Sequence, residues 1–578
     1  MKKTITSIIL LATIGSSHVT NAQSPNWLWA KAMGGTSIDV AQSIAVDPAG
    51  SGALYTTGYF TGTVDFDPGA GVFNLTAAGL WDIFIFKLDG SGNFVWAKAM
   101  GGPGNHEGVS IAIDPASGAI YTTGFFSATV DFDPGVGVFN LTSAGSGDIF
   151  ISKLDASGNF VWAKQMGGIA YDKCYSIAID TAGSGALYTT GVFEGTADFD
   201  PGVGTFNLTP AGSSDIFISK LDSTGNFVWA KRMGGTDFDF SYSISIDPAG
   251  SGDVYTTGHF EGTADFDPGA GTFNLTPAGQ YEIFISKLDS SGNFVWAKRI
   301  GGTGRDVAYS ITIDPSGSGD VYTTGYFTGT ADFDPGAGVF NLAGAGFFDI
   351  FISKLDASGN FVWAKAMGAT GWDYGLSIAS DPAGSGAVYT TGSFMGTADF
   401  DPDAGVFNLT AAGGPDIFIS KLDASGNFVW AKAMGGTSDD SGNSITLDAS
   451  GHVHVAGDFD SPTISFGSIT LTNAGGKDIF IARLDTAIIT GNNEIENSGK
   501  GVLVFPNPVT SHLTVALPGN SKKTEVTITD ITGKIIYTTI SAGTHKIEVN
   551  TNDFAEGIYV VKIQTADFIA TKKLIVEK

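Results

Sequence analysis

The sequence predicts an all-β protein: a seven-bladed β-propeller closed by its own N-terminal strand, followed by an immunoglobulin-like β-sandwich. Two observations carry this prediction. The tripeptide Trp-Ala-Lys recurs seven times at intervals of 66 or 67 residues, beginning at Trp29, Trp96, Trp162, Trp229, Trp296, Trp363 and Trp430. Every interval also holds short β-branched and aromatic runs separated by Gly, Asp, Ser and Pro, with no sustained helical periodicity.

One repeat contains four candidate strands. In the third copy they are residues 176–180 (SIAID), 187–193 (LYTTGVF), 215–221 (DIFISKL) and 227–233 (FVWAKRM). Four short strands in a unit of this length are typical of a propeller blade. The alternative is an open solenoid, but near-identical units without divergent polar caps favour a closed ring, because an open array would expose apolar ends.

The strand count predicts how the ring closes. Counted from the Ser-Ile strand outward to the Trp strand, the last copy ends at 478–485 with only three strands. The unmatched Trp strand at residues 27–33 should therefore supply the fourth. Pairing the two ends would cover a sheet edge that otherwise invites aggregation.

The flanking segments differ from the repeats. Lys2 and Lys3, the apolar run 5–14 and the small residues ending at Ala22 predict a signal peptide over residues 1–22. The propeller is expected over 23–485, a polar linker over 486–500 and a separate domain over 501–578. The single cysteine, Cys174, excludes an internal disulfide.

The charge is strongly negative and unevenly distributed. The net charge is −28, but residues 501–578 hold 8 Lys against 7 acidic residues, so the remainder carries 22 basic and 51 acidic groups. Coulomb repulsion then disfavours nucleic acid and anionic membranes as partners. Divalent cations, neutral sugars and basic partners are compatible with this charge. No run of about 20 apolar residues predicts a membrane span.

The repeat resembles a known family. Trp-Ala-Lys, Gly-Gly, a loop Asp, Ser-Ile-x-x-Asp, Tyr-Thr-Thr-Gly and Asp-Ile-Phe-Ile-x-Lys-Leu-Asp together resemble the bacterial SBBP-type propeller repeats over residues 27–485, and the strand order is similar to that of NHL repeats. The resemblance implies the fold. It does not imply a ligand, because propellers include enzymes, lectins and scaffolds.

About seven candidate strands within residues 501–578 predict the immunoglobulin-like sandwich. Several of its motifs resemble the type IX secretion sorting domain of Bacteroidetes, with Phe505 where that family usually has Tyr. The residues concerned are Phe505, Pro506, Asn507, Pro508, Gly533, Lys534, Gly557 and Tyr559. The resemblance implies periplasmic transit, contact with the type IX machinery, removal of this domain, and a secreted or outer cell-surface location. The alternative is an ordinary terminal sandwich that assists folding.

Calcium is the one cofactor for which the sequence offers candidate ligands. Ten residues after each Trp stand Asp39, His106, Asp172, Asp239, Asp306, Asp373 and Asp440. Carboxylates suit hard cations, so the six aspartates are candidate metal ligands. The favoured interpretation is structural, with each Asp capping backbone amides of its own loop. The Asp-Phe-Asp-Pro-Gly insert, as at 65–71, is likewise better explained as a hairpin tip than as a calcium loop, since it lacks a bidentate Glu.

Residues that break the repeat are the candidates for ligand binding, because identical copies cannot supply the unlike groups that catalysis requires. They gather in the loops before the Ser-Ile strands and form a predicted rim of His106, Glu107, Tyr171, Phe238, Arg305, Trp372 and Tyr374. The rim has aromatic rings suited to stacking on sugars and one His-Glu pair. It holds no discernible nucleophile, base and acid, so no catalytic residue is assigned.

The favoured function is that of a secreted or cell-surface, non-enzymatic binding or adhesion protein whose ligand is a glycan or a protein. A carbohydrate-active enzyme on a propeller scaffold and a structural surface component are the alternatives.

Overall fold

The computed structural model describes residues 25–486, and in the C-terminal part residues 503–505, 507, 509–517, 523–530, 534–542, 546–565 and 569–576. The predicted signal peptide and nearly all of the predicted linker lie outside these residues. The chain forms two compact units, residues 1–487 and 488–578. The described residues form strands, turns and bends without a helix, so no described helix could cross a membrane.

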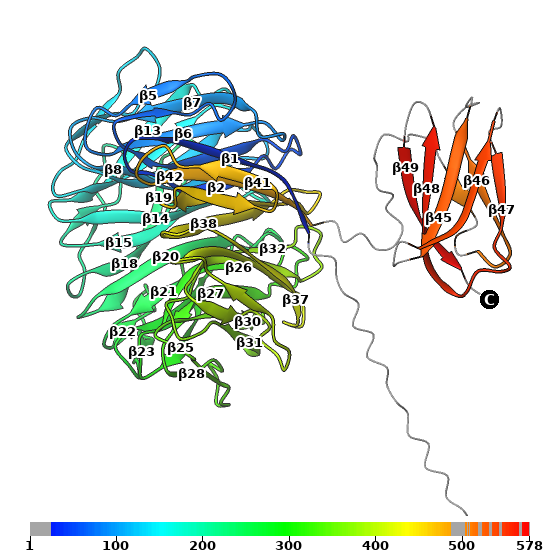
Figure 1. The fold of residues 1–578 in the computed structure, drawn as a ribbon. Helices are drawn as coiled ribbons and strands as arrows, with labels where there is room; N and C mark the ends of the chain where they lie inside the picture. Colours follow the sequence, from blue (N-terminus) through cyan, green and yellow to red (C-terminus); the bar gives the residue numbers. More distant parts are fainter. Residues whose placement is uncertain are drawn as a thin grey trace, which may run out of the picture. The chain divides into compact units, whose positions relative to one another are not determined.

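The first compact unit consists of repeated four-stranded antiparallel sheets (Figure 1). In the third, β14 (Asp172–Ile179), β15 (Leu187–Phe193), β18 (Asp215–Leu221) and β19 (Phe227–Gly235) pair in chain order. Short runs of apolar, β-branched and small residues let the inner strands β15 and β18 bury side chains on both faces of the sheet.

Five further sheets, here numbered as units one, two, four, five and six, share this order. Their strands are β2 (Asp39–Val46), β3 (Leu54–Phe60), β6 (Asp82–Leu88) and β7 (Phe94–Met100); β8 (His106–Ile113), β9 (Ile120–Phe126), β12 (Asp148–Leu154) and β13 (Phe160–Gly168); β20 (Asp239–Ile246), β21 (Val254–Phe260), β24 (Glu282–Leu288) and β25 (Phe294–Gly302); β26 (Val307–Ile313), β27 (Val321–Phe327), β30 (Asp349–Leu355) and β31 (Phe361–Met367); β32 (Tyr374–Ser380), β33 (Val388–Phe394), β36 (Asp416–Leu422) and β37 (Phe428–Met434).

The seventh unit joins the two ends of the repeat region. It pairs β38 (Asp440–Leu447), β39 (Val453–Phe459) and β42 (Asp478–Asp485) with β1 (Asn26–Gly35) as the outermost strand. Met33 pairs with Ile479 and Ala30 with Ala482, and in Figure 1 the blue β1 runs beside the gold β42. This is the pairing that the strand count predicts.

The Ser-Ile dipeptide of each repeat connects neighbouring units. The Ile amide of each unit donates to the Ser hydroxyl of the unit before it, at 3.2–3.3 Å. The donor–acceptor pairs are Ile111–Ser43, Ile177–Ser110, Ile244–Ser176, Ile311–Ser243, Ile378–Ser310, Ile445–Ser377 and Ile44–Ser444. The last pair returns to the first unit, so the hydrogen bonds run through all seven units in sequence.

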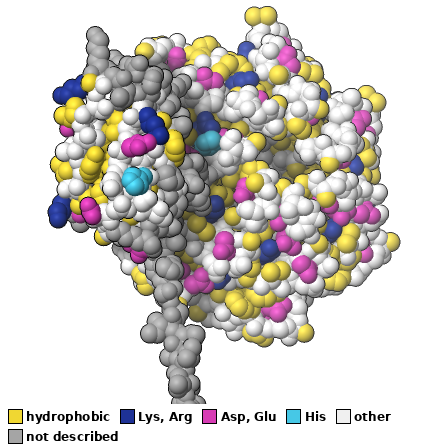
Figure 2. Space-filling view, turned by 90° about the vertical axis from the view of Figure 1, so that its right-hand side faces the viewer, with side chains coloured by type: hydrophobic (Ala, Val, Ile, Leu, Met, Phe, Trp, Pro, Cys, Tyr) yellow, Lys and Arg dark blue, Asp and Glu magenta, His cyan; other side chains and the backbone are white. Residues whose placement is uncertain are grey.

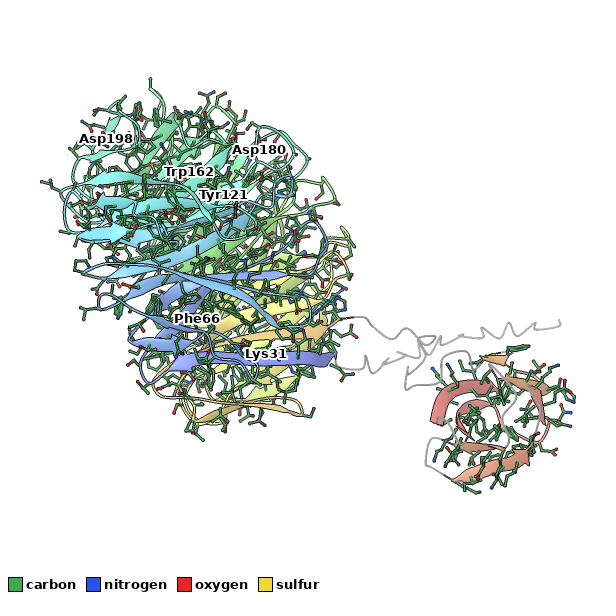
Figure 3. All side chains as sticks on the ribbon, turned by 90° about the horizontal axis from the view of Figure 1, so that it is seen from above. Lys31, Phe66, Tyr121, Trp162, Asp180 and Asp198 are labelled. Atoms are coloured by element: carbon green, nitrogen blue, oxygen red, sulfur yellow. The ribbon has the colours of Figure 1, made fainter. Side chains whose placement is uncertain are left out.

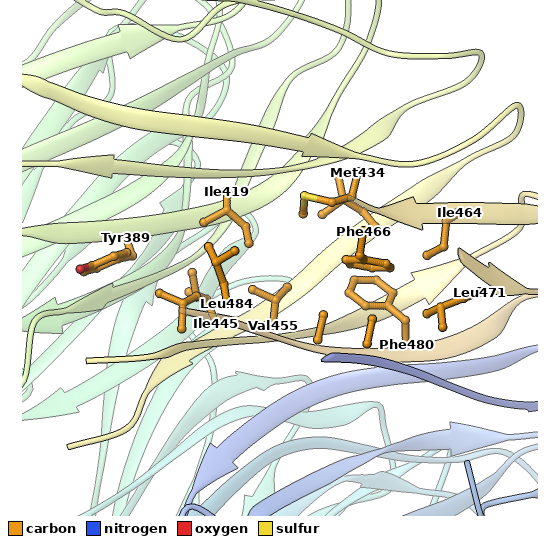
Figure 4. Close-up of a cluster of buried hydrophobic side chains, with 14 of the residues drawn as sticks. Tyr389, Ile419, Met434, Ile445, Val455, Ile464, Phe466, Leu471, Phe480 and Leu484 are labelled. Atoms are coloured by element: carbon orange, nitrogen blue, oxygen red, sulfur yellow. The ribbon is translucent and has the colours of Figure 1, made fainter. Parts of the chain in front are cut away.

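The core lies between neighbouring units. In the cluster of Figure 4, Ile419 and Met434 of the sixth unit pack with Val455, Phe466 and Phe480 of the seventh, and all five are buried. Removing one such ring would cost about 3–5 kcal/mol, because the cavity left behind closes only in part. Every unit therefore depends on both of its neighbours.

A hairpin inserted between the second and third strands links each unit to the preceding one. In the first unit it comprises β4 (Thr63–Asp65) and β5 (Asn74–Thr76), and Gly35 at the end of β1 pairs with Val64. The insert anchors through Phe66, which is buried against Phe60 and Phe84 (Figure 3). The corresponding hairpins are β10 (Thr129–Asp131) with β11 (Asn140–Thr142), β16 (Ala197–Asp198) with β17 (Asn207–Leu208), β22 (Ala264–Asp265) with β23 (Asn274–Leu275), β28 (Thr330–Asp332) with β29 (Asn341–Ala343), β34 (Thr397–Asp399) with β35 (Asn408–Thr410), and β40 (Thr463–Phe466) with β41 (Ile469–Thr472).

The repeated Tyr, Lys and Trp form a second inter-unit contact. In the second unit the Lys153 ammonium lies over the Tyr121 ring, at 4.9 Å from its centroid, and Trp162 packs on the same ring (Figure 3). Both Lys153 and Tyr121 donate to the Ser223 carbonyl of the next unit, at 3.3 and 3.5 Å. The recurrence of these three residue types is thus explained by structure.

The second compact unit contains two antiparallel sheets over a common core of Val, Leu, Ile and aromatic side chains. One sheet orders β43 (Leu503–Phe505), β44 (His512–Ala516) and β47 (Lys546–Asn550). The other orders β46 (Ile535–Ser541), β45 (Thr524–Asp530), β48 (Gly557–Thr565) and β49 (Ile569–Val576).

The sorting motifs hold this unit together. Asn507 donates through Nδ2 to the Lys573 carbonyl and accepts from the Ile575 amide, both at 2.8 Å, which fixes the terminal strand β49. The Tyr559 hydroxyl donates to the Ala555 carbonyl at 2.8 Å, and the Lys534 amide donates to the Asp530 carboxylate at 3.0 Å. Gly557 opens β48 and Phe505 is exposed, whereas Pro506, Pro508 and Gly533 lie outside the described residues.

Candidate functional site

Five positions of the repeat change from unit to unit, as do neighbouring loop positions such as that of Leu80 and Gln280. The loop position before the first strand is Ile38, Asn105, Tyr171, Phe238, Arg305, Trp372 or Asp439. The position two residues later, in the first strand, is Val40, Glu107, Lys173, Phe240, Val307, Tyr374 or Ser441. A bulge position two residues later is Gln42, Val109, Tyr175, Tyr242, Tyr309, Leu376 or Asn443. On the second strand the residue is Tyr59, Phe125, Val192, His259, Tyr326, Ser393 or Asp458, and before the third strand it is Trp81, Gly147, Ser214, Tyr281, Phe348, Pro415 or Lys477. We call these positions together the variable face.

The topology brings the five positions together. First and second strands pair so that Phe240 lies opposite His259 and Glu107 opposite Phe125. The loop position forms an isolated parallel bridge to the residue that precedes the third strand of the preceding unit, as between Arg305 and Tyr281. A register shift at the bulge position re-aims that side chain, which is the usual effect of a β-bulge.

Aromatic rings fill this face in the fourth unit. The His259 ring stacks on Phe240 with centroids 5.2 Å apart and lies 4.8 Å from Tyr281. Tyr242 contacts His259 at 5.6 Å and reaches Tyr175 and Tyr309 of the adjacent units at 5.1 and 5.3 Å. Burial lowers the pKa of His259 to about 4, so its imidazole is neutral at neutral pH.

The rings continue through the fifth and sixth units. Tyr326 contacts Tyr309 at 5.8 Å and Phe348 at 4.6 Å. Phe348 in turn contacts Trp372 at 6.4 Å and Tyr374 at 5.4 Å. Because each ring is fixed by its neighbours, these units present a rigid aromatic surface.

Cations of the protein cover some of the rings. The Arg305 guanidinium lies over Tyr281, at 5.2 Å, and its Nε donates to Gln280 at 2.9 Å. The Lys173 ammonium lies over Phe125 and Tyr175, at 5.0 and 5.2 Å, and forms an ion pair with Glu107 at 2.6 Å.

The seventh unit is polar at the same positions. Asn443 donates to Asp458 at 2.7 Å and to the Ala41 carbonyl of the first unit at 3.0 Å. Lys477 forms an ion pair with Asp458 at 2.8 Å. The variable face therefore has an aromatic side and a polar side. Acidic side chains are also spread over the surface of the repeat region shown in Figure 2.

The structure separates the predicted rim residues into three groups. Phe238, Arg305 and Trp372 are exposed, whereas Tyr171 and Tyr374 are half-buried and pack on other rings. Glu107 is nearly buried by its ion pair with Lys173.

The placement of His106 on the rim is wrong. Its side chain is wholly buried, its Nε2 lies 3.1 Å from the Gly102 carbonyl, and its Nδ1 accepts from the Ser127 amide at 3.4 Å. Its backbone amide belongs to the same inter-unit contact as those of the aspartates, because the His106 amide donates to the Trp81 carbonyl. His106 thus replaces a framework aspartate.

The six candidate metal ligands are buried, and their carboxylates accept backbone amides. Asp172, for example, accepts from Gly168 at 2.7 Å and from Glu194 at 3.1 Å. The same two-amide pattern, at 2.6–3.1 Å, holds for Asp39, Asp239, Asp306, Asp373 and Asp440. This is the geometry that the structural interpretation expects. Within the described residues no three His, Cys, Asp or Glu side chains group as metal ligands.

A second acid from the preceding unit faces each of these buried groups. The Asp148 carboxylate acts on Asp172, and the pKa of Asp172 is raised to about 7 by burial and further by Asp148, against the effect of the two amides. A Cβ on Gly167 would contact both side chains, which explains why a glycine stands there. Asp39 with Asp478 and Asp239 with Asp215 repeat the arrangement, and their pKa is likewise raised.

The insert hairpins also use their carboxylates internally. Asp65 accepts from the Asp67 and Phe73 amides at 3.0 and 2.8 Å, and Asp67 accepts from Gly69 at 2.8 Å. Cavities of about 260 and 390 Å³ lie under two of these hairpins. The residues that line them, such as Asp332 and Asp334, recur in the repeats. These cavities are therefore part of the repeated architecture.

Sequence reasoning missed several members of the aromatic surface, notably Tyr242, Tyr281, Tyr309, Tyr326 and Phe348. The signal was present, because aligning the copies at their 67-residue spacing shows which columns vary. The missing step was the pairing of first, second and third strands, which turns five separate columns into one surface.

Comparisons with known proteins concern the two parts of the chain separately. The chain is 24% identical over 475 residues to an uncharacterized WD repeat-containing protein of Acanthamoeba polyphaga mimivirus, covering 68% of this chain and 33% of that protein. It is 23% identical over 409 residues to the regulatory protein FlaEY of Caulobacter vibrioides, covering 58% and 41%. The chain thus spans between a third and two fifths of the length of these relatives.

Among solved structures, Sqt1 of Chaetomium thermophilum is similar at 11% identity with a TM-score of 0.35 when bound to the N-terminus of ribosomal protein L10. That match covers 74% of this chain and 96% of Sqt1. A second structure of Sqt1 from Chaetomium thermophilum is similar at 10% identity with a TM-score of 0.33, covering 80% of this chain and 98% of Sqt1.

The C-terminal part has a match of a different kind. Residues 503–577 match the family model of the secretion system C-terminal sorting domain. This supports export by the type IX secretion system and a secreted or cell-surface location. The chain therefore combines an all-β, propeller-like repeat region with a secretion system C-terminal sorting domain.

Proposed function

We propose that this protein acts outside the cell as a non-enzymatic binding or adhesion protein whose ligand occupies the variable face. One observation carries the proposal: in a chain of near-identical repeats, five positions that differ from unit to unit meet on one surface. A framework that only built a surface layer would have no need to differ there from unit to unit.

The proposal includes the architecture. The repeat region is a seven-bladed, SBBP-type propeller closed by β1, and an immunoglobulin-like sorting domain of the Bacteroidetes type follows. The supporting observations are the pairing of β1 with β42 and the Ser-Ile hydrogen bonds, which pass through seven units and return to the first. A signal peptide over residues 1–22 would start the export that the sorting domain completes.

A carbohydrate-active enzyme is the second candidate, because the carboxylates of Glu261 and Asp237 interact with each other, and Glu261 interacts with Arg305, which lies over the Tyr281 ring. Burial raises the pKa of Glu261, the nearby Asp237 raises it further, and Arg305 lowers it. Glycoside hydrolysis uses a pair of carboxylates of unlike pKa. We favour binding, because each of these acids arises from a loop position rather than from a rigid strand.

The experiment that decides between them is direct. The mature protein should bind surface material, such as polysaccharides or proteins immobilised from the producing cells, and substitution of Trp372 and Phe238 should abolish that binding. Reducing-sugar assays on the same polysaccharides should show no product. Release of oligosaccharides that is lost in Glu261→Gln would overturn the non-enzymatic proposal.

A further inference from the structure

Building on the binding function proposed above, we infer that the ligand is an uncharged polysaccharide, bound as an extended chain along the rings of the fourth to sixth units. Three features of the variable face lead to this ligand class. Its rings are exposed and rigid, cations of the protein already lie over some of them, and its side chains outside ion pairs carry a net negative charge.

The rings have faces available for stacking. Phe238 is 45% exposed and Trp372 is 50% exposed, while Tyr281, Phe348 and Tyr374 are half-buried. Pyranose rings carry patches of C–H groups that pack on aromatic faces, and a ring already fixed by its neighbours loses little conformational entropy on binding. Phe348 fixes Trp372 and Tyr374, so these rings are pre-organised.

A cationic ligand is disfavoured at three rings of the variable face, because cations of the protein already lie over them. Arg305 lies over Tyr281, and Lys173 lies over both Phe125 and Tyr175. A ligand ammonium would have to displace a side chain that already makes this interaction, and in the case of Lys173 also break its ion pair with Glu107.

An anionic ligand is disfavoured by charge. Lys173 and Lys477 are neutralised by Glu107 and Asp458. The other charged side chains near the loop positions are the cation Arg305 and the anions Asp237, Glu261 and Asp439. The net charge of this group is therefore negative. A polyanion would be repelled by this surface and by the acidic repeat region as a whole.

The arrangement of the rings favours a chain of sugars over a single sugar. Contacts run from Tyr281 and His259 in the fourth unit, through Tyr309 and Tyr326 in the fifth, to the sixth-unit ring Trp372. A polar group accompanies them: among the described residues, the Gln280 side chain bonds only to the Nε of Arg305, which leaves its NH₂ group to donate. This amide suits the hydroxyls of a neutral glycan.

The test is affinity electrophoresis of the mature protein in gels containing one polysaccharide each: the neutral mannan, xylan and β-1,3-glucan, and the acidic alginate and polygalacturonate. We expect retardation by at least one neutral polysaccharide, little changed by 0.5 M NaCl. Phe238→Ala/Trp372→Ala should weaken it at least 10-fold. Phe407→Ala, which removes a 38% exposed ring on an insert hairpin, should stay within twofold of the unsubstituted protein. Thermal melts confirm that all variants fold.

Three outcomes overturn the inference: no retardation by any neutral polysaccharide, retention of neutral binding in the double variant, or binding to the acidic polysaccharides alone. If the double variant instead loses capture of a protein or of an acidic polysaccharide, the binding function stands and only the ligand class is wrong. If oligosaccharides are released from these gels by the protein, the binding function itself is wrong.

Discussion

The backbone amide of Ile44 donates to the hydroxyl of Ser444 at 3.2 Å, although 400 positions separate them. Equivalent bonds join each Ser-Ile strand to the next, so the first and last units are neighbours in the same sense as any other pair. The stability of the whole repeat region should therefore depend on its chain ends.

Deleting residues 23–34 should destabilise the entire repeat region. The deletion removes most of β1, and with it the outer partner of β42. Because neighbouring units share their cores, we expect the whole repeat region to unfold in one transition. Its melting temperature in differential scanning calorimetry should be lower by several degrees. Leu28→Ala, at a 46% exposed position of the same strand, is the matched control and should melt within about one degree of the unsubstituted protein. An unchanged melting temperature after the deletion would show that β1 contributes nothing to the ring.

Stability should fall as pH rises from about 4 to about 7. Burial raises the pKa of Asp39, Asp172 and Asp239 to about 7 and that of Asp306 and Asp373 to about 6, from an ordinary value of 3.8. A pKa that is raised in the folded state favours the protonated carboxyl group there. These groups therefore stabilise the folded state fully below pH 4, and the stabilisation is lost as the pH rises through their pKa values in the folded protein. Urea denaturation between pH 4 and pH 8 measures this. A midpoint that climbs steadily with pH would contradict it.

Asp416→Asn should reveal how much one buried carboxyl group contributes to this pH dependence of stability. Asp416 is buried, accepts from the Ala412 amide through Oδ2 at 2.9 Å, and leaves Oδ1 unpartnered. Burial raises its pKa to about 6, and the facing Asp440 raises it further. The asparagine side chain of this variant can still accept from the Ala412 amide through its oxygen and can donate through its NH₂ group towards Asp440. The free energy of unfolding should therefore rise by about 1 kcal/mol at pH 8 and stay unchanged at pH 4. Asp423→Asn, in an exposed turn where Asn427 and Ser425 donate to the carboxylate, should instead destabilise at pH 8. Equal effects of Asp416→Asn at both pH values would rule out a titrating pair.

Calcium should leave the melting temperature unchanged. The carboxylates of Asp39, Asp172 and their equivalents already accept two backbone amides each, and those of the insert hairpins cap their own turns. A ligand that binds only the folded state raises the melting temperature, so a scan with 5 mM CaCl₂ and one with EDTA should coincide. A calcium-dependent rise that Asp172→Asn removes would restore the metal hypothesis.

Deleting residues 501–578 should leave a folded repeat region that is not exported across the outer membrane. The two compact units have separate cores, so the repeat region does not need the sorting domain to fold. Cell fractionation and protease accessibility of intact cells should place the truncated protein in the periplasm. Asn507→Ala should have a milder effect in the same direction, because it frees the terminal strand. Surface display that survives the deletion would exclude the sorting role.

The strands, the repeat units and the pairing of β1 could be predicted from the sequence, because they depend on local residue patterns. Turn residues and alternating short runs predicted the strands, the 67-residue spacing predicted the units, and the unmatched Trp strand predicted where β1 pairs. The sorting motifs identified the C-terminal part, which the family match to residues 503–577 bears out. The loop aspartates accept backbone amides, as the common behaviour of Asp predicts.

Packing between units determines which repeat-breaking residues form one surface. Because His106 differs from the Asp of the other copies, the sequence predicts a rim residue, yet burial makes it part of the framework. Tyr281 and Arg305 are 24 positions apart, and their contact depends on a third strand meeting the first strand of the next unit. Local propensity acts over a few residues, whereas this surface is made by side chains from separate units, so its ring contacts and its buried acid pairs follow from packing alone.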